Sequence, residues 1–181
     1  GLTGETTAAV TISNVAPDVI VGPDQSADEG DAVFFSGDFV DPGCDSWTYE
    51  WNFGDGSPIV TETLTPSHAF GDNGIYMVTL TVTDDDGGVG SETMIVTVMN
   101  VIPSVSFDSL DQANPQFILP VVHNLHYHGN FTDPGWLDTH ISSWDFGDGT
   151  VVAGTVTEEN IEPDATGTTN ADHTYMTPGS Y

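Results

Sequence analysis

The sequence predicts an all-β protein built from tandem antiparallel β-sandwiches, and three observations lead to this prediction. Residues 78–83 and 94–99 show a period-two alternation and are rich in β-branched side chains, which is typical of half-buried strands. No stretch of the chain keeps a helical period for three turns. The phrase Trp-Asn-Phe-Gly-Asp-Gly at residues 51–56 returns as Trp-Asp-Phe-Gly-Asp-Gly at residues 144–149, which indicates a repeated structural unit.

The individual strands follow from the same alternation and from the turn residues between them. The Asp- and Gly-rich residues 84–88 connect the two alternating runs and predict the turn of a final hairpin. Residues 32–36 and 47–53 predict earlier strands, with a turn at residues 54–56. Short strands at this spacing favour a sandwich of seven strands, in which Trp51 and Trp144 are expected to anchor the core.

Further repeated segments set the domain boundaries. Asn-Val-Ala-Pro at residues 14–17 returns 86 residues later as Asn-Val-Ile-Pro, and Phe-Val-Asp-Pro-Gly at residues 39–43 returns as Phe-Thr-Asp-Pro-Gly at residues 131–135. We therefore predict one complete sandwich over residues 14–99. Residues 100–181 are expected to form a second sandwich that lacks its last two strands.

Residues 1–13 precede Asn14 in the same way that residues 88–99 precede Asn100. They are therefore predicted to be the last strand of a preceding or neighbouring domain. Two interpretations stay open: truncation of a longer protein, or donation of this strand to the open sandwich of another subunit. The residues that would form the polymerisation strand are Ala9, Val10, Thr11 and Ile12.

Composition excludes several partners. The chain has 28 Asp and Glu residues but no Lys or Arg, and its formal net charge is −28. Nucleic acid, anionic lipid and acidic glycans are therefore not expected to bind. Screening by salt or by bound cations is expected instead. No run of 18 apolar residues is present, so no direct membrane insertion is predicted for this segment.

The single cysteine, Cys44, excludes an internal disulfide framework. Each unit must therefore be stabilised by its core and by any metal that it binds. We expect Cys44 to be buried or half-buried.

Several motifs together resemble polycystic kidney disease (PKD) domains. They are the Trp-Asn-Phe-Gly-Asp-Gly phrase, Pro-Ser-His-Ala-Phe at residues 66–70, Gly-Ile-Tyr-Met-Val-Thr-Leu-Thr-Val-Thr-Asp at residues 74–84, and the flanking Asn-Val-x-Pro segments. The resemblance is more specific in the first repeat than in the second. It implies immunoglobulin-like sandwiches that are found in extracellular surface proteins and as accessory modules of secreted hydrolases.

The resemblance also implies Ca²⁺ sites made by oxygen ligands from separate loops, which suit a hard cation. Carried over residue by residue, the ligands in the first repeat are Asn14, Asp41, Asp45 and Asp84, with Asp86 as an additional candidate. In the second repeat they are Asn100, Asp133 and Asp138. The alternative is that these groups are solvated turn aspartates.

The sequence also offers candidates for two other kinds of site. His126 and His128 are two residues apart on an expected strand, with His123 nearby. They could suggest zinc, but an exposed strand face explains the pair equally well. Asn130 lies in the only Asn-x-Ser/Thr sequon of the chain and is a candidate for glycosylation in an expected loop.

Two functions remain open from the sequence. The leading hypothesis is a structural spacer or assembly module of a long extracellular surface or filament protein, stabilised by Ca²⁺ and contacting other domains or copies of the same protein. The alternative is an accessory module of a secreted hydrolase that binds carbohydrate or protein. That function would use an exposed aromatic platform, for which Trp47, Tyr127 and Trp136 are the candidates. No catalytic role is predicted.

Overall fold

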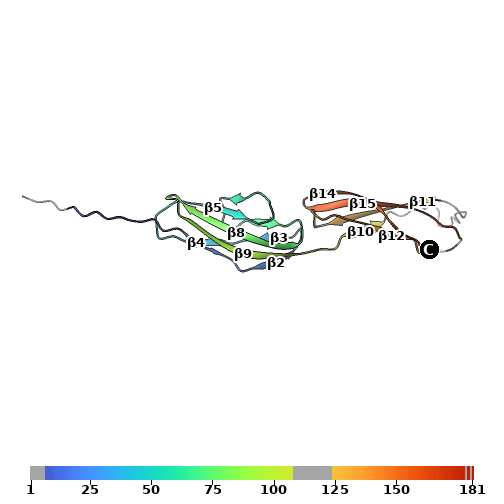
Figure 1. The fold of residues 1–181 in the computed structure, drawn as a ribbon, viewed down its shortest axis with the longest axis horizontal. Coiled ribbons are helices and arrows are strands. Elements are labelled where there is room, and N and C mark those ends of the chain that lie inside the picture. The colour runs from blue at the N-terminus through green and yellow to red at the C-terminus, as the bar shows by residue number, and fades with distance from the viewer. Residues whose placement is uncertain (1–6, 108–123, 178, 180) are drawn as a thin grey trace, which may run out of the picture. The chain divides into compact units, whose positions relative to one another are not determined.

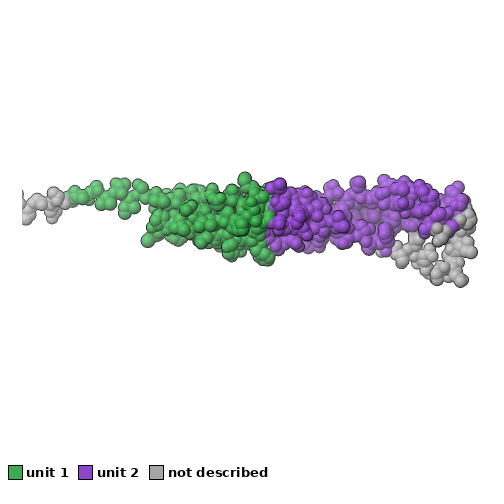
Figure 2. Space-filling view, turned by 90° about the horizontal axis from the view of Figure 1, so that it is seen from below, with its two compact units in different colours: residues 1–25, 34–67, 76–96 green, residues 26–33, 68–75, 97–181 purple. Residues whose placement is uncertain are grey.

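The computed structural model describes residues 7–107, 124–177, 179 and 181. In this part of the chain the regular structure consists of β-strands, and no helix occurs (Figure 1). The all-β prediction is therefore confirmed. The chain divides into two compact units, coloured separately in Figure 2. Unit 1 contains residues 1–25, 34–67 and 76–96, and unit 2 contains residues 26–33, 68–75 and 97–181.

Nine strands follow one another between Asp18 and Met99. They are β1 (Asp18–Val21), β2 (Gln25–Asp28), β3 (Ala32–Phe34), β4 (Gly37–Val40), β5 (Trp47–Asn52), β6 (Val60–Thr61), β7 (Ser67–Ala69), β8 (Gly74–Asp84) and β9 (Val89–Met99). The largest sheet has the order β2-β9-β8-β5-β6, while β1 pairs with β4 and β3 pairs with β7.

The structure has nine strands between Asp18 and Met99 rather than the expected seven, and two short breaks contribute to the difference. Gly22, Pro23 and Asp24 separate β1 from β2, and these two strands join different sheets. Proline has no N–H to donate to a sheet, so this segment is suited to the change of partner. A second interruption at Phe35 and Ser36 separates β3 from β4.

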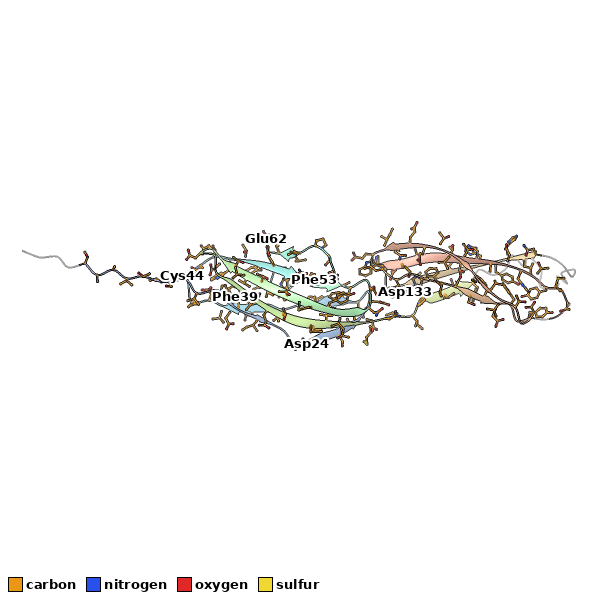
Figure 3. The ribbon with its side chains drawn as sticks, viewed as in Figure 1. Asp24, Phe39, Cys44, Phe53, Glu62 and Asp133 are labelled. Carbon is orange, nitrogen blue, oxygen red and sulfur yellow. The ribbon has the colours of Figure 1, made fainter. Side chains whose placement is uncertain are left out.

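The core of unit 1 is centred on Trp51, whose side chain is completely buried. Its ring lies 5.6 Å from that of Phe35, and Phe35 in turn lies 5.2 Å from Phe53, which is labelled in Figure 3. On β8 the inward positions Val78, Leu80 and Val82 are fully buried, as the period of two predicts. Trp51 also donates a hydrogen bond from Nε1 to the carbonyl of Thr63 at 3.1 Å.

The predicted final hairpin is present as β8 and β9, which are neighbours in the large sheet. At its turn, Asp84 N donates to Gly88 O at 3.0 Å. Gly87 has a φ of +88°, a conformation that glycine adopts without steric cost. The Asp- and Gly-rich turn predicted from the sequence is thus confirmed.

The six remaining strands belong to unit 2. They are β10 (Ser104–Phe107), β11 (Asn124–Asp133), β12 (Ser143–Asp145), β13 (Val151–Ala153), β14 (Thr155–Ile161) and β15 (Asp164–Thr174). Four of them form an antiparallel sheet in the order β10-β11-β15-β14, and β12 pairs with β13.

The core of unit 2 repeats the aromatic anchor of unit 1. Trp144 on β12 is buried, and its Nε1 donates to the hydroxyl of Thr169 on β15 at 3.1 Å. The rings of Tyr127 and Phe146 are 4.9 Å apart, and Tyr127 also lies 5.8 Å from Trp144. The expectation that Trp51 and Trp144 are core residues is confirmed.

Candidate functional site: two carboxylate groups

The first carboxylate group lies in unit 1 and consists of Asp41, Asp45 and Asp84. One oxygen from each residue lies within 4.8 Å of the other two. The β-sheet register explains this arrangement, because β5 pairs with β8 so that Trp47 is opposite Asp84. The loop between β4 and β5, which carries Asp41 and Asp45, is therefore brought to the end of β8.

Hydrogen bonds hold two of these carboxylates in place. Asn14 donates from Nδ2 to both oxygens of Asp84, at 3.1 and 2.9 Å, and Gly88 N donates to Asp84 Oδ1 at 2.7 Å. Asp41 accepts a bond from Gly43 N at 2.7 Å through Oδ1, while its buried Oδ2 has no hydrogen-bond partner. The group therefore presents a carboxylate oxygen that lacks a protein donor.

The two ends of the group differ in electrostatics. The side-chain hydrogen bond from Asn14, helped by backbone N–H donors and opposed by burial, lowers the pKa of Asp84. Burial, together with the negative charges of Asp41 and the aspartates at residues 84–86, raises the pKa of Asp45. A cation placed among these oxygens would relieve the repulsion at Asp45.

The structure brings together most, but not all, of the ligands expected for the first repeat. Asp41, Asp45 and Asp84 form one group, and Asn14 contacts it through Asp84. Asp86 instead lies with Asp45 and Asp85 in a neighbouring cluster that is more exposed. Ca²⁺ binding itself remains a prediction.

Cys44 lies in the same loop, between Asp41 and Asp45. Its thiol is free and the residue is exposed, so the expectation of a buried or half-buried cysteine is wrong. The loop directs the carboxylates of Asp41 and Asp45 toward Asp84, which leaves residue 44 on the solvent side.

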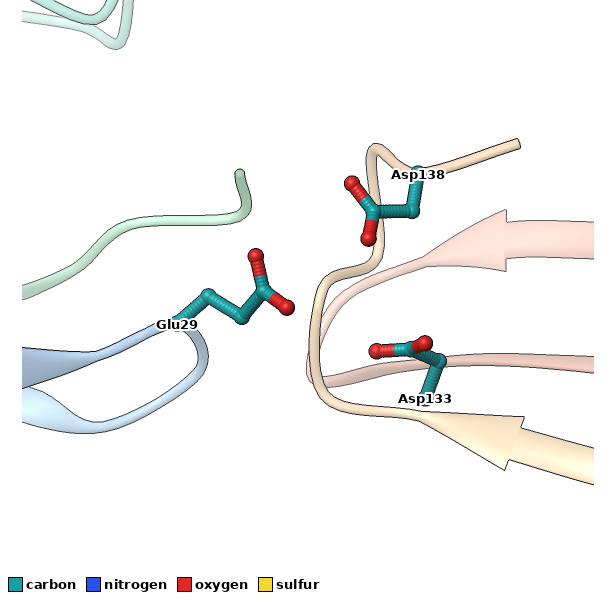
Figure 4. A group of neighbouring side chains, drawn as sticks. All are labelled: Glu29, Asp133 and Asp138. Carbon is teal, nitrogen blue, oxygen red and sulfur yellow. The ribbon is translucent and has the colours of Figure 1, made fainter. Parts of the chain in front are cut away.

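The second carboxylate group lies within unit 2 and consists of Glu29, Asp133 and Asp138. Glu29 is in the turn after β2, Asp133 is the last residue of β11, and Asp138 is in the loop that follows β11. Figure 4 shows the three carboxylates pointing toward one another, and Figure 3 labels Asp133 in its place on the ribbon. One oxygen from each lies within 4.8 Å of the others.

A histidine contacts this second group. His140 Nε2 lies 3.1 Å from Asp133 Oδ2, and His140 Nδ1 lies 2.7 Å from Glu158 Oε2. Burial lowers the pKa of His140, but the bonds to Asp133 and Glu158 outweigh it and raise the pKa above its ordinary value. The histidine is thus held between two carboxylates.

The structure changes the ligand set expected for the second repeat. Asp133 and Asp138 come together as expected. The side chain of Asn100 is exposed and donates from Nδ2 to the carbonyl of Val101 at 3.0 Å, and its role as a ligand stays a prediction. Glu29, which the sequence did not suggest, also takes part. The Asp-Glu-Gly-Asp sequence of residues 28–31 is typical of a solvated turn. The burial of Glu29 follows only from the tertiary structure.

The histidines do not form a metal group with one another in the described residues. The three candidate metal groups there consist of carboxylates alone. His126 lies on β11 and contacts Asp172 on the neighbouring strand β15. His128 is half-buried on the same strand, and His123 lies outside the described residues.

The aromatic platform is not formed by the expected residues. Trp47, Tyr127 and Trp136 are each half-buried rather than exposed. Trp47 packs against Phe39 with ring centroids 5.2 Å apart, and Tyr127 donates a hydrogen bond to the hydroxyl of Tyr175 at 3.0 Å. These contacts occupy the rings within the domains.

The remaining predicted sites can be placed on the structure without being tested by it. Val10 and Ile12 of the expected polymerisation strand are 83% and 91% exposed, and residues 7–13 lie outside the strands. Asn130 is half-buried within β11, between Ser106 of β10 and Thr168 of β15, so the expected loop is wrong. Strand donation and glycosylation stay predictions. No helix in the described part of the chain is long and apolar enough to cross a membrane.

His173 contacts the Asp-Gly turn of the second repeat. Its ring stacks on Phe146 at 4.3 Å, and its Nε2 lies 2.8 Å from Asp148 Oδ2. Burial raises the pKa of Asp148, but the bonds from Thr150 N and His173 outweigh this effect and lower it. His173 therefore connects the end of β15 to this turn.

The lowered pKa of Asp148 predicts a contribution to acid sensitivity. Because the pKa is lower in the folded than in the unfolded state, the stabilisation is complete above the ordinary aspartate pKa and is lost as pH falls through the folded value. Asp148→Asn should therefore lose less stability than the unchanged chain between about pH 7 and about pH 2.5. Urea unfolding at both pH values measures this difference. An equal loss in both proteins would contradict the prediction.

Comparison with known proteins agrees with the motifs and the fold. Residues 14–99 match the family model described as PKD domain. A segment of 89 residues is 35% identical to Microbial collagenase of Vibrio alginolyticus, covering 48% of this chain and 11% of that protein. A segment of 104 residues is 30% identical to Collagenase ColA of Clostridium perfringens (strain 13 / Type A), covering 57% of this chain and 9% of that protein. The chain thus matches about a tenth of the length of these curated relatives.

One solved structure, about half the length of this chain, is also related in sequence. The PKD1 domain of Vibrio anguillarum Epp is 30% identical, with a TM-score of 0.40. The similarity covers 48% of this chain and 96% of that domain.

Proposed function

Residues 14–99 belong to the PKD domain family, and from that premise we propose that the chain is a non-catalytic accessory module of a larger extracellular enzyme. The observation that carries this proposal is the match to about a tenth of each of two proteins named as collagenases. A module of that size leaves most of such a protein for other domains. The sandwich core and the acidic loops also fit a module that is stabilised by cations outside the cell.

The accessory role is tested by separating binding from hydrolysis. The 181-residue chain is expected to sediment with insoluble collagen above a control without fibres, and to release no soluble peptides from it. Hydrolysis by this chain alone would contradict a non-catalytic module. Failure to sediment would count against a substrate-binding accessory role and would favour a spacer.

We propose that Ca²⁺ stabilises unit 1 through Asp41, Asp45 and Asp84, with Asn14 orienting Asp84. The close carboxylate oxygens and the unpartnered Asp41 Oδ2 support this proposal. Ca²⁺ binds through about six to eight oxygens, so main-chain carbonyls and water would complete the coordination. The ion would offset the repulsion among these carboxylates.

Ca²⁺ at about 100 times its Kd should add about 2.7 kcal/mol to the free energy of unfolding. Asp45→Asn should remove most of that gain, because it deletes one ligand charge while keeping the size of the side chain. Calorimetric melting in Ca²⁺ and in EGTA measures the effect. Asp18→Asn, an exposed change on β1, is the matched control and should keep the full response. A Ca²⁺ response unchanged in Asp45→Asn would exclude this site.

A spacer role is a second candidate, supported by the connection between β9 and β10. Only four residues separate Met99 from Ser104, and Pro103 is one of them. Proline restricts the backbone of such a short connection. Small-angle scattering in Ca²⁺ and in EGTA tests this role. A spacer stiffened by Ca²⁺ should give a broader distribution of dimensions in EGTA, and identical profiles would count against it.

A further inference from the structure

The second carboxylate group is built from two backbone segments that are each fixed by hydrogen bonds. In the turn after β2, Glu29 N donates to Met99 O at 3.0 Å and Gly30 N donates to Phe70 O at 2.9 Å. In the loop after β11, Leu137 N donates to Gly71 O at 2.9 Å and Asp138 N donates to Gly135 O at 3.0 Å. The facing carboxylates are therefore positioned by main chain on both sides.

Glu29 is buried and only half satisfied. Its side chain is 1% exposed, and Oε1 accepts a hydrogen bond from Val101 N at 2.6 Å. The other oxygen, Oε2, is buried without a hydrogen-bond partner. Figure 4 shows this carboxylate directed into the space between Asp133 and Asp138. A buried charged oxygen without a donor is costly unless a cation or a proton occupies the space in front of it.

The chain offers little positive charge to balance this group. It contains no Lys or Arg, and the histidine that contacts the group, His140, is shared between Asp133 and Glu158. Asp133 is itself 1% exposed, and its Oδ1 accepts a bond from Gly135 N at 2.8 Å. One shared histidine cannot balance three converging carboxylates.

The electrostatic consequence is visible at two of the three residues. Burial, opposed by the hydrogen bond from Val101 N, raises the pKa of Glu29, and the charges of Asp138 and Asp133 add to the rise. Burial also raises the pKa of Asp138, with further contributions from Asp72 and Asp133. The charge of His140 opposes the rise at Asp138 without reversing it.

Gly135 allows the two sides to approach each other. A Cβ atom at this position would lie 2.8 Å from Glu29 Cδ and 3.0 Å from both Glu29 Oε1 and Asp138 Oδ2. Any side chain at residue 135 would therefore push into the carboxylate group. The absence of a side chain leaves the space around these oxygens open.

We propose that Glu29, Asp133 and Asp138 bind one hard divalent cation, for which Ca²⁺ is the probe, and that Glu29 is a ligand supplied by the turn after β2. The three carboxylates supply hard oxygen ligands, and main-chain carbonyls and water complete the coordination. This site is separate from the Asp41 group and does not depend on the accessory role. Its occupancy would tie the turn at residues 28–31 to the loop at residues 133–138.

The first test is Ca²⁺ binding to the full 181-residue chain by isothermal titration calorimetry after removal of metal with EGTA. Glu29→Gln keeps the size of the side chain and the acceptor for Val101 N but removes the ligand charge. It should eliminate one Ca²⁺ site or weaken it by at least about tenfold. Glu92→Gln, on an exposed position of β9, is the matched control and should bind as the unchanged chain does.

Stability with and without the ion separates a ligand from a structural residue. In EGTA, Glu29→Gln should melt at the same temperature as the unchanged chain or higher, because a buried charge is removed. In Ca²⁺, Glu29→Gln should melt at a lower temperature than the unchanged chain, because the variant binds the ion less tightly. A similar decrease in both conditions would show that Glu29 acts only as the acceptor for Val101 N, and would overturn the proposal.

Two further variants complete the test. Gly135→Ala places a methyl group against Glu29 and should weaken the same Ca²⁺ site even though all three carboxylates remain. Asp45→Asn should leave the Glu29 site unchanged, because Asp45 belongs to the carboxylates around Asp41, so failure of that site and failure of this one are distinguishable. Equal Ca²⁺ stoichiometry and affinity in Glu29→Gln and the unchanged chain would also overturn the proposal. So would a result in which Glu29→Gln melts at a higher temperature than the unchanged chain while Ca²⁺ changes the melting temperature of neither protein.

Discussion

Trp51→Ala should destabilise the first sandwich by about 3–5 kcal/mol, the range for removing a large aromatic side chain from a core. Trp51 is completely buried and packs against Phe35. The substitution leaves a cavity and also removes the hydrogen bond from Nε1 to Thr63 O, which leaves that carbonyl without this donor. Urea unfolding monitored by circular dichroism measures the change.

The control for this prediction is Phe34→Ala, at the last residue of β3. Phe34 is an aromatic residue of the same sandwich but is 73% exposed, and its removal should change stability by no more than about 0.5 kcal/mol. If Trp51→Ala and Phe34→Ala had similar effects, the placement of Trp51 at the centre of the core would be wrong.

Gly54→Ala should destabilise unit 1 by about 2–5 kcal/mol, because two costs add at this position. Gly54 has a φ of +79°, which disfavours any residue with a Cβ. In addition, a Cβ atom there would lie 2.6 Å from the carbonyl oxygen of Met77. That oxygen belongs to the backbone of β8, which cannot move without disturbing the sheet.

Gly56 provides a matched comparison within the same turn. Its φ of +85° is nearly the same, but no atom lies within 4 Å of the position of an added Cβ. Gly56→Ala should therefore cost only the backbone strain, about 1–2 kcal/mol. Thermal melting of the two variants measures the difference between strain alone and strain with a clash. Equal effects would show that the contact with Met77 is relieved without cost.

The sequence predicts the core of this protein well because a core depends on local patterns. Alternation along β8 identifies Val78, Leu80 and Val82 as inward residues, and all three are buried. The repeated aromatic phrase likewise identifies Trp51 and Trp144 as core residues, and both are buried. A period of two determines which face a residue occupies without any knowledge of its partners.

The second carboxylate group could be predicted only in part, because it depends on contacts between distant segments. Asp133 ends β11 and Asp138 lies in the loop that follows, so the two are expected to lie close together. Glu29 is 104 residues before Asp133 in the chain, and nothing in the turn sequence distinguishes a buried glutamate from a solvated one. The proposal of Asn100 as a ligand rests on the analogy with Asn14 and stays a prediction; its Nδ2 donates to the carbonyl of Val101.

Asn130 shows a different limit of sequence analysis. Adjacent Gly129 and Asn130 suggest a loop, yet both residues lie within β11 and are paired on both sides, with β10 and with β15. Pairing on two edges stabilises a strand whose own residues have a low preference for extended structure. Local preference was therefore overridden by the neighbouring strands.

The exposed thiol of Cys44 makes this protein convenient to observe. It is the only cysteine of the chain, and it lies between two of the three residues of the Asp41 group, so a maleimide dye would attach at a single known place in that loop. Fluorescence from this dye would report on the loop directly, without additional substitutions. The chain also contains no lysine, so the only amine that could be labelled is the one at the chain terminus. The thiol of Cys44 therefore allows labelling at a single position.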